Sequence, residues 1–183
     1  MTIRERVRPA DRPARIVAAA RDMAERDGWS AVTVRRLAGA IGYSQPVLYQ
    51  HFPGGRSQIV AAVAREAFGL VAHAIRPPRG TTGAPAVHAI AEGYLRFADE
   101  HPALYEAMFE LPSDERFATA ATPAQVREPF EIIAAAFAGS PDPGTEAELF
   151  WATLHGLVTL ERGGRLPARS REARVAAAVR RYA

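Results

Sequence analysis

TVRRLAGAIGYSQPVLYQHFPGGR, residues 33–56, is the stretch that decides the fold. Thr33 is of a type that caps helices, because its hydroxyl accepts a free backbone N–H of the first turn. Leu37 and Ile41 follow at a spacing of four, which places them on one helical face. Gly42 then supplies a turn, since glycine adopts a positive φ at no steric cost. The spacing predicts a short helix that ends at this glycine.

A second short helix is expected after the turn. Ser44 would cap it, and Pro46 fits its first turn, where a missing N–H does no harm. Leu48 and Phe52 are four apart and would pack against the first helix. The side chains left to point outward are those of Ser44, Gln45, Val47, Tyr49 and Gln50. Two short helices joined by a glycine turn predict a helix-turn-helix, whose second helix presents a polar face to a DNA groove.

The pattern T-V-R-x-L-A-x-x-x-G-x-S-x-x-x-L-Y-x-H-F resembles the DNA-binding domain of TetR-family transcriptional regulators. Two ordinary core helices would explain its apolar positions, but they would not explain Arg35, Tyr49 and His51 around so short a helix. The resemblance implies an N-terminal three-helix domain with a basic arm, residues 1–56. A ligand-binding and dimerisation domain would follow, residues 57–183.

The resemblance also implies which residues contact DNA. The second short helix would enter a major groove and place Gln45, Val47 and Tyr49 near base edges. There, Gln can bridge N6 and N7 of adenine, and Val can touch a thymine methyl group. Thr33, Tyr49 and His51 match positions that contact phosphates in the family, and Arg35 would reach a guanine or a phosphate. The full predicted set is Thr33, Arg35, Ser44, Gln45, Pro46, Val47, Tyr49, His51 and Arg56.

Arg56 departs from the commoner family pattern, which has a Lys three residues after the Phe. Here the basic residue comes four after Phe52, behind an additional glycine. The N-terminal arm, residues 1–12, is rich in Arg. An arm of this kind either stays solvated or lies in a minor groove.

Charge is distributed unevenly along the 183 residues. Residues 1–56 hold ten Arg and five acidic residues, residues 57–160 hold six Arg and 13 acidic residues, and residues 161–183 hold seven Arg and two acidic residues. The basic first segment coincides with the helix-turn-helix, as expected for a protein that binds a polyanion. The chain has no cysteine, which excludes disulfides and cysteine zinc sites.

No membrane segment is expected, because no apolar run approaches the roughly 18 residues that a membrane helix needs. The first residues are charged and lack the apolar stretch of a signal peptide. The expected location is therefore the cytoplasm.

The whole chain is predicted to be all-α, because apolar residues keep helical spacing and no stretch alternates with period 2. Asp11 and Pro13 mark the start of a first helix that Gly28 ends. A long helix is expected over residues 57–75, with Leu70 among its inward side chains. Further helices are expected over residues 87–100, 102–111, 123–137, 145–162 and 170–182.

A second pattern lies near the C-terminus. Trp151, His155 and Gly156, in W-x-x-x-H-G, and the segment HPALYEAMF at residues 101–109 are similar to the WHG class of TetR C-terminal domains. This resemblance implies a small-molecule effector between helices and a homodimer through a four-helix bundle of helices 145–162 and 170–182. The predicted ligand-binding residues are Tyr94, Phe97, Tyr105, Met108, Phe109, Phe130, Phe137, Trp151 and His155. Most aromatic side chains at helical spacing simply fill the core.

The predicted function is a homodimeric repressor that binds a palindromic DNA operator, with recognition helices about 34 Å apart, and leaves it when an effector binds. No enzyme, cofactor or metal is predicted, because the five histidines lack metal-ligand spacing and no G-x-S-x-G motif occurs. The alternative is an all-α small-molecule-binding protein or enzyme with a vestigial DNA-binding head. Binding to duplex DNA at several salt concentrations distinguishes the two.

Overall fold

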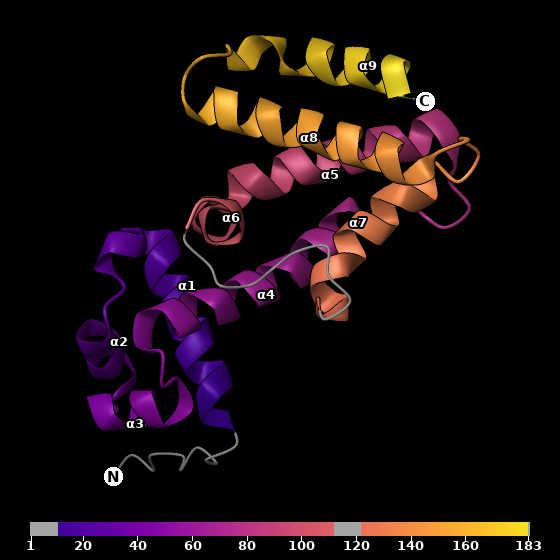
Figure 1. Ribbon diagram of the computed structural model, residues 1–183. Helices are drawn as coiled ribbons and strands as arrows, with labels where there is room; N and C mark the ends of the chain where they lie inside the picture. The colour runs from indigo at the N-terminus through magenta and orange to yellow at the C-terminus, as the bar shows by residue number, and fades with distance from the viewer. Residues whose placement is uncertain (1–10, 112–121, 183) are drawn as a thin grey trace. The chain divides into compact units, whose positions relative to one another are not determined.

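The computed structural model describes residues 11–111 and 122–182, and this part of the chain is all-α, as predicted (Figure 1). Residues 1–10 of the basic arm and the helix break expected at Pro112 lie outside the described residues, whereas Arg12 is the first residue of a helix.

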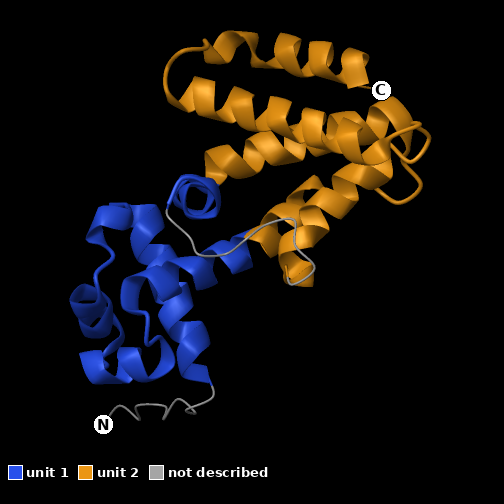
Figure 2. Cartoon of the chain, in the orientation of Figure 1, with its two compact units in different colours: residues 1–67, 101–116 blue, residues 68–100, 117–183 orange. Residues whose placement is uncertain are grey.

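Two compact units divide the chain: residues 1–67 with 101–116, and residues 68–100 with 117–183 (Figure 2). The first unit holds α1 (Arg12–Asp27), η2 (Trp29–Ala31), α2 (Val34–Ile41), α3 (Gln45–His51), the first part of α4 (Gly55–Ile75) and α6 (Pro102–Phe109). The second holds the end of α4, α5 (Gly83–Glu100), α7 (Ala124–Ala136), α8 (Pro143–Arg162), η3 (Ala168–Ser170) and α9 (Arg171–Tyr182). The predicted boundary at residue 56 divides the chain by function and stays a prediction. The two units defined by packing differ from it, because α6 belongs to the same unit as the N-terminal helices.

Local signals set the ends of the first helices. Pro13 lies in the first turn of α1, and Gly28, at φ 77°, follows its last residue. The Thr33 hydroxyl accepts the Arg36 backbone N–H at 3.2 Å and so caps α2, as predicted. Gly42 ends α2 in the left-handed conformation, at φ 69°. α2 and α3 therefore form because the sequence places a cap and a glycine at the required positions.

The core of the first unit is apolar and includes α6. Its buried side chains include Ile16, Ala20, Met23, Trp29, Leu37, Leu48 and Phe52. The Trp29 indole N–H donates to the Ala103 carbonyl at 2.7 Å. The Glu25 carboxylate accepts the backbone N–H groups of Ala103 and Leu104 at 3.2 and 3.1 Å. The end of α1 and η2 therefore hold the first turn of α6.

The long helix differs from the prediction at two points. It begins at Gly55, two residues earlier than expected. The Gln58 side chain, in the first turn of the helix, accepts the N–H of Gly54, the residue before the helix, at 2.9 Å. Leu70, predicted to face inward, is 43% exposed. That prediction was wrong because Ala67, Phe68 and Val71 already supply the buried face at this level of the helix.

α4 is also more apolar than the sequence analysis expected. An 18-residue window of this helix has a mean hydropathy of 1.3, which by length and composition would suffice to cross a membrane. A core helix meets the same criterion, and half of this window is buried inside the structure. Burial therefore accounts for the hydropathy of α4.

The second unit packs α5 closely against the end of α4. A Cβ added to Gly93 would lie 2.3 Å from the Ala74 carbonyl oxygen, so only glycine permits this approach.

α8 begins at Pro143, two residues earlier than predicted, because Asp142 accepts the Thr145 N–H at 3.2 Å. Hydrogen bonds from Thr145 hold the pKa of Asp142 below its ordinary value.

Candidate nucleic-acid interface

The turn between α2 and α3 is held by backbone hydrogen bonds. The Tyr43 N–H donates to the Ala38 carbonyl at 2.9 Å, while Gly42 supplies the left-handed residue. Ser44 precedes α3 in an extended conformation, but its side chain makes no capping hydrogen bond, contrary to the prediction. Pro46, in the first turn, fixes the start of α3 instead.

α3 buries one face and exposes the other. Leu48 is 1% exposed and Phe52 is 6% exposed, so the helix is anchored as predicted. Tyr49, in contrast, is 48% exposed. The exposed residues at this helix are Ser44, Gln45, Pro46, Tyr49 and Gln50, and Val47 is half-buried. We call these six residues the α3 ridge.

Tyr49 stands against the beginning of α4. Gly55 has a φ of 60°, and a Cβ added there would lie 3.3 Å from Cε1 of the Tyr49 ring. The missing side chain at Gly55 therefore makes room for the ring and allows a backbone conformation that L-residues rarely adopt. The additional glycine noted in the sequence thus supports the position of Tyr49.

The other predicted DNA-binding residues differ in exposure. Thr33 is exposed, although its hydroxyl already caps α2. Arg35 is exposed, whereas neighbouring Arg36 lies 3.4 Å from Asp27. The hydrogen bond from Arg26 lowers the pKa of Asp27, which keeps that carboxylate charged. Arg36 therefore shares the Asp27 carboxylate with Arg26.

His51 is half-buried at the last residue of α3. Its Nε2 atom is buried and has no hydrogen-bond partner among the described residues. That nitrogen faces the interior of the unit, so a phosphate contact by His51 would need its other ring nitrogen.

Arg56 is used differently from the expectation. Its Nε donates to the Val32 carbonyl at 2.9 Å and its Nη2 donates to the Trp29 carbonyl at 3.0 Å. The guanidinium also lies 6.0 Å from the centre of the Trp29 ring. These contacts join the start of α4 to the η2 segment, while Arg56 as a whole remains exposed.

Sequence reasoning missed one cationic cluster in this unit. The guanidinium carbons of Arg12 and Arg15 lie 5.9 and 5.7 Å from the centre of the Tyr43 ring. Arg15 Nη1 also donates to the Tyr43 hydroxyl at 3.4 Å. The only sequence signal was the pair of arginines three apart in the first turn of a helix, which is common on solvated faces.

The predicted ligand-binding residues fall into both units. In the first unit, Tyr105 and Met108 are buried, and the Tyr105 and Phe109 ring centres are 4.8 Å apart. The other six belong to the second unit: Tyr94, Phe97, Phe130, Phe137, Trp151 and His155.

Within the second unit, the aromatic residues form two groups. The Trp151 indole N–H donates to the Tyr94 hydroxyl at 3.1 Å, and the Phe130 ring centre lies 6.2 Å from that of Trp151. Phe137 packs instead on Phe150 at 5.6 Å. Phe97 is buried, and His155 is half-buried one turn after Trp151. The structure therefore brings Tyr94, Phe130 and Trp151 together.

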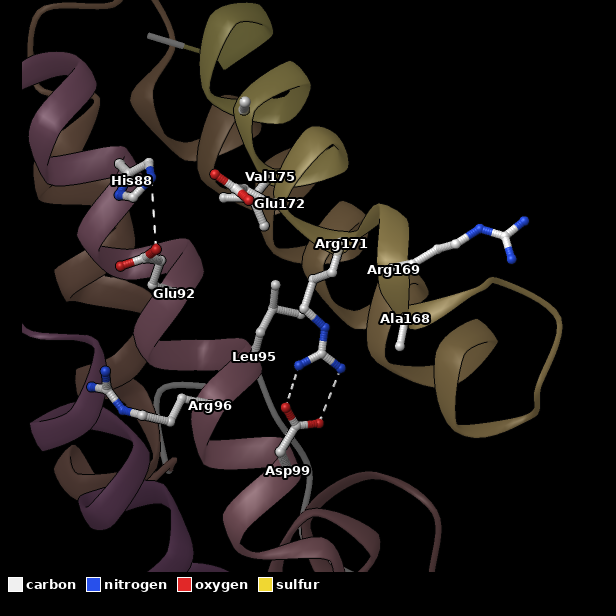
Figure 3. A pocket seen from close by; sticks show the side chains of 11 residues that line it. His88, Glu92, Leu95, Arg96, Asp99, Ala168, Arg169, Arg171, Glu172 and Val175 are labelled. Carbon is white, nitrogen blue, oxygen red and sulfur yellow. Dashed lines mark hydrogen bonds and ion pairs between the residues drawn. The ribbon is translucent and has the colours of Figure 1, made fainter.

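A cavity of about 620 Å³ lies between α5 and the η3–α9 segment, and none of the predicted ligand-binding residues line it (Figure 3). Arg171 donates to Asp99 and to Glu161, which raises the pKa of its guanidinium above the ordinary value. Arg174 also pairs with Glu161, whose side chain is only 5% exposed. These ion pairs fix α9 on α5 and α8.

The chain matches known proteins over both units. Residues 16–63 match the family described as bacterial regulatory proteins, tetR family, and residues 87–182, more than half of the chain, match the family described as tetracyclin repressor-like, C-terminal domain. An uncharacterized HTH-type transcriptional regulator of Mycobacterium tuberculosis, Rv0681, is 28% identical over 165 residues, which cover 86% of this chain and 76% of that protein.

Solved structures share the fold. A protein with unknown function from Rhodococcus sp. RHA1 is similar with a TM-score of 0.72 at 24% identity, over 98% of this chain and 95% of the other. A TetR variant from Acinetobacter baumannii AYE, in complex with minocycline, is similar with a TM-score of 0.67 at 14% identity, over 91% of each chain. At these identities, the likeness concerns the fold alone.

Proposed function

The chain belongs to the TetR family of bacterial regulatory proteins, and we propose that it is a cytoplasmic repressor that binds a palindromic operator as a homodimer and leaves it when a small-molecule effector binds. Its place in the family makes it a transcriptional regulator with a DNA-binding domain. The observation that carries the proposal is the α3 ridge, in which five exposed side chains and half-buried Val47 lie on a helix anchored by Leu48 and Phe52.

The ridge supports distinct roles in the proposed complex. The first residues of a recognition helix contact base edges in the major groove, so Gln45 and Val47 would determine sequence preference. Tyr49 would contact a phosphate and fix the register of the helix. The remaining proposed contacts are made by Thr33, Arg35, Ser44, Pro46 and His51. Arg56 would support them by holding the start of α4.

A second copy of the chain is the partner that the exposed face of α8 fits. Leu149 is 52% exposed and Leu160 is 41% exposed, although both are large apolar residues. Between them, a Cβ added to Gly156 would meet no atom within 4 Å, so this face leaves room for another helix. We assign the homodimer interface to α8 and α9, which would form a four-helix bundle with the partner.

The effector would bind in the body of the protein. Tyr94, Phe130 and Trp151 supply aromatic surface in the second unit, and His155 follows one turn later. The minocycline complex of the Acinetobacter baumannii neighbour supports a small-molecule effector for this fold. Because α4 contributes residues to both units, a displacement of α4 would change the separation of the two recognition helices and release the operator.

The test is a DNA-binding measurement on a duplex selected from a random pool. Affinity should fall steeply with salt concentration, because phosphate neutralisation releases counterions. Tyr49→Ala should abolish specific binding while the circular dichroism spectrum stays that of the folded protein. Leu70→Ala is the matched control, because the exposed fraction of Leu70 is similar to that of Tyr49 and Leu70 lies outside the first unit.

Specific binding by Tyr49→Ala at moderate salt would contradict the placement of the ridge. A wild-type protein that binds no duplex and shows no salt dependence would favour the alternative, a small-molecule-binding protein with a vestigial DNA-binding head.

A further inference from the structure

Arg12, Tyr43 and Arg15 form a compact group in the first unit. Both guanidinium carbons lie within 6 Å of the centre of the Tyr43 ring, at 5.9 and 5.7 Å, a distance at which a ring attracts a cation. The 3.4 Å hydrogen bond from Arg15 to the Tyr43 hydroxyl adds a direct link. One ring is therefore in contact with two positive charges.

No carboxylate balances these two charges in the part of the chain that the structure describes. Asp11, the neighbouring acidic residue, forms no ion pair with either arginine. The other arginines of α1 are paired, since Arg21 lies 3.1 Å from Asp22 and Arg26 lies 3.1 Å from Asp27. The Arg12 and Arg15 guanidinium groups thus have the Tyr43 ring but no carboxylate as a partner, and both would attract an anion bound beside the ring.

The group lies beside the recognition helix. Tyr43 is separated from the first residue of α3 only by Ser44, and α1 contacts α3. The start of α1 and helix α3 lie at the same end of the first unit (Figure 1). When the first residues of a recognition helix enter a major groove, cations beside them come near the phosphates that border the groove.

We infer that Arg12, Tyr43 and Arg15 form a phosphate clamp that holds one backbone phosphate of each operator half-site. Tyr43 positions the two guanidinium groups, which donate hydrogen bonds to the phosphate oxygens. This inference rests on the proposed function, because it needs a duplex bound along α3. The clamp lies on α1 and the turn, and none of its residues belongs to the predicted DNA-binding set, although Arg12 is also the last residue of the basic arm.

The test compares two double variants with the same loss of charge. Arg12→Gln with Arg15→Gln removes the clamp, and Arg21→Gln with Arg26→Gln removes two paired arginines of the same helix. At a rise of 1.5 Å per residue, Arg21 and Arg26 start about 14 and 21 Å beyond Arg12, farther than the Debye length of about 10 Å at 0.1 M salt. Binding to the selected duplex is measured by fluorescence anisotropy at several salt concentrations.

The clamp variant should make the negative slope of log K against log salt shallower by about 0.9 for each half-site, because one phosphate contact is lost there. The loss of affinity should be the same for the selected duplex and for a duplex with altered bases, since phosphates carry no sequence information. The control variant should keep the slope of the wild-type protein.

Equal slopes for the clamp variant, the control variant and the wild type would overturn the clamp while the proposed function stands. A wild-type protein without specific binding to any selected duplex would overturn both. A shallower slope in the clamp variant alone would support the contact.

Discussion

Gly55 carries two constraints at a single residue. Its φ of 60° disfavours any L-residue, and its missing side chain leaves room for the Tyr49 ring. We expect Gly55→Ala to lower the free energy of unfolding by about 1–2 kcal/mol, the cost of a left-handed residue with a Cβ. It should also weaken DNA binding, because the new methyl group pushes on Tyr49. Urea denaturation and anisotropy measure the two effects.

Gly39 provides the opposite case in the same unit. It lies inside α2, no φ above zero occurs there, and an added Cβ meets nothing within 4 Å. Gly39→Ala should therefore raise the free energy of unfolding by about 0.5–1 kcal/mol, since alanine loses less entropy than glycine in a helix. If both substitutions changed stability in the same direction, the explanation from φ would be wrong.

Gln45 is the residue of the ridge whose chemistry is most specific. It is exposed at the first position of α3 and can bridge N6 and N7 of adenine. Gln45→Ala should cost about 1–3 kcal/mol of discrimination at one base position per half-site. Selection of duplexes by the variant should then show a relaxed preference at that position alone. An unchanged preference would exclude Gln45 from base contact.

Among the elements, α6 is the one whose attachment can be tested most directly. The Glu25 carboxylate, on α1, accepts two backbone N–H groups from the first turn of α6. It acts as a capping side chain does, although it belongs to another helix. Glu25→Ala should lower the free energy of unfolding by about 1 kcal/mol, the usual cost of losing a cap. Amide hydrogen exchange should accelerate at Ala103 and Leu104.

Glu25→Gln is the control for that substitution, because the amide keeps one acceptor oxygen. It should retain part of the protection at these two amides. Trp29 provides an independent hydrogen bond to the Ala103 carbonyl. If Glu25→Ala left exchange at both amides unchanged, the carboxylate would not hold α6.

The helices could be predicted from the sequence more fully than their attachments. Caps and glycines such as Thr33, Gly28 and Gly42 act within a few residues, so the pattern predicted α1, α2 and α3 closely. Arg56 and Glu25 bond to backbone groups 24 to 79 residues away, and no local pattern predicts such partners. Leu70 was wrongly predicted to face inward, because an apolar side chain alone does not show which neighbouring residues already fill the core.

The candidate site shows the same limit. Helical spacing around Leu48 predicted which side of α3 is exposed. In the structure, Leu48 is buried and Gln45, Tyr49 and Gln50 are exposed. The position of the Tyr49 ring against Gly55, and the meeting of Arg12 and Arg15 at Tyr43, depend on how α1, α3 and α4 pack. Distances of this kind follow from tertiary structure and not from periodicity.

For the whole molecule, the proposed DNA recognition by one short helix needs a second copy of the chain. A palindromic operator presents two half-sites with recognition helices about 34 Å apart, which two linked heads can bind together. The exposed Leu149 and Leu160 on α8 are the residues whose burial would link them. The assignment of this face is therefore tested by the oligomeric state.

Leu149→Glu with Leu160→Glu should convert the dimer into monomers in analytical ultracentrifugation. Burial of an unpaired carboxylate costs several kcal/mol, and each 1.4 kcal/mol corresponds to about a tenfold change in Kd. Even about 3 kcal/mol would raise the dimer Kd more than a hundredfold, and operator affinity would fall with it. Because both leucines are exposed in the single chain, the helical content should not change. Leu70→Glu, at a residue with 43% exposure on α4, is the control that should stay dimeric. A dimer that survives the double substitution would place the interface elsewhere.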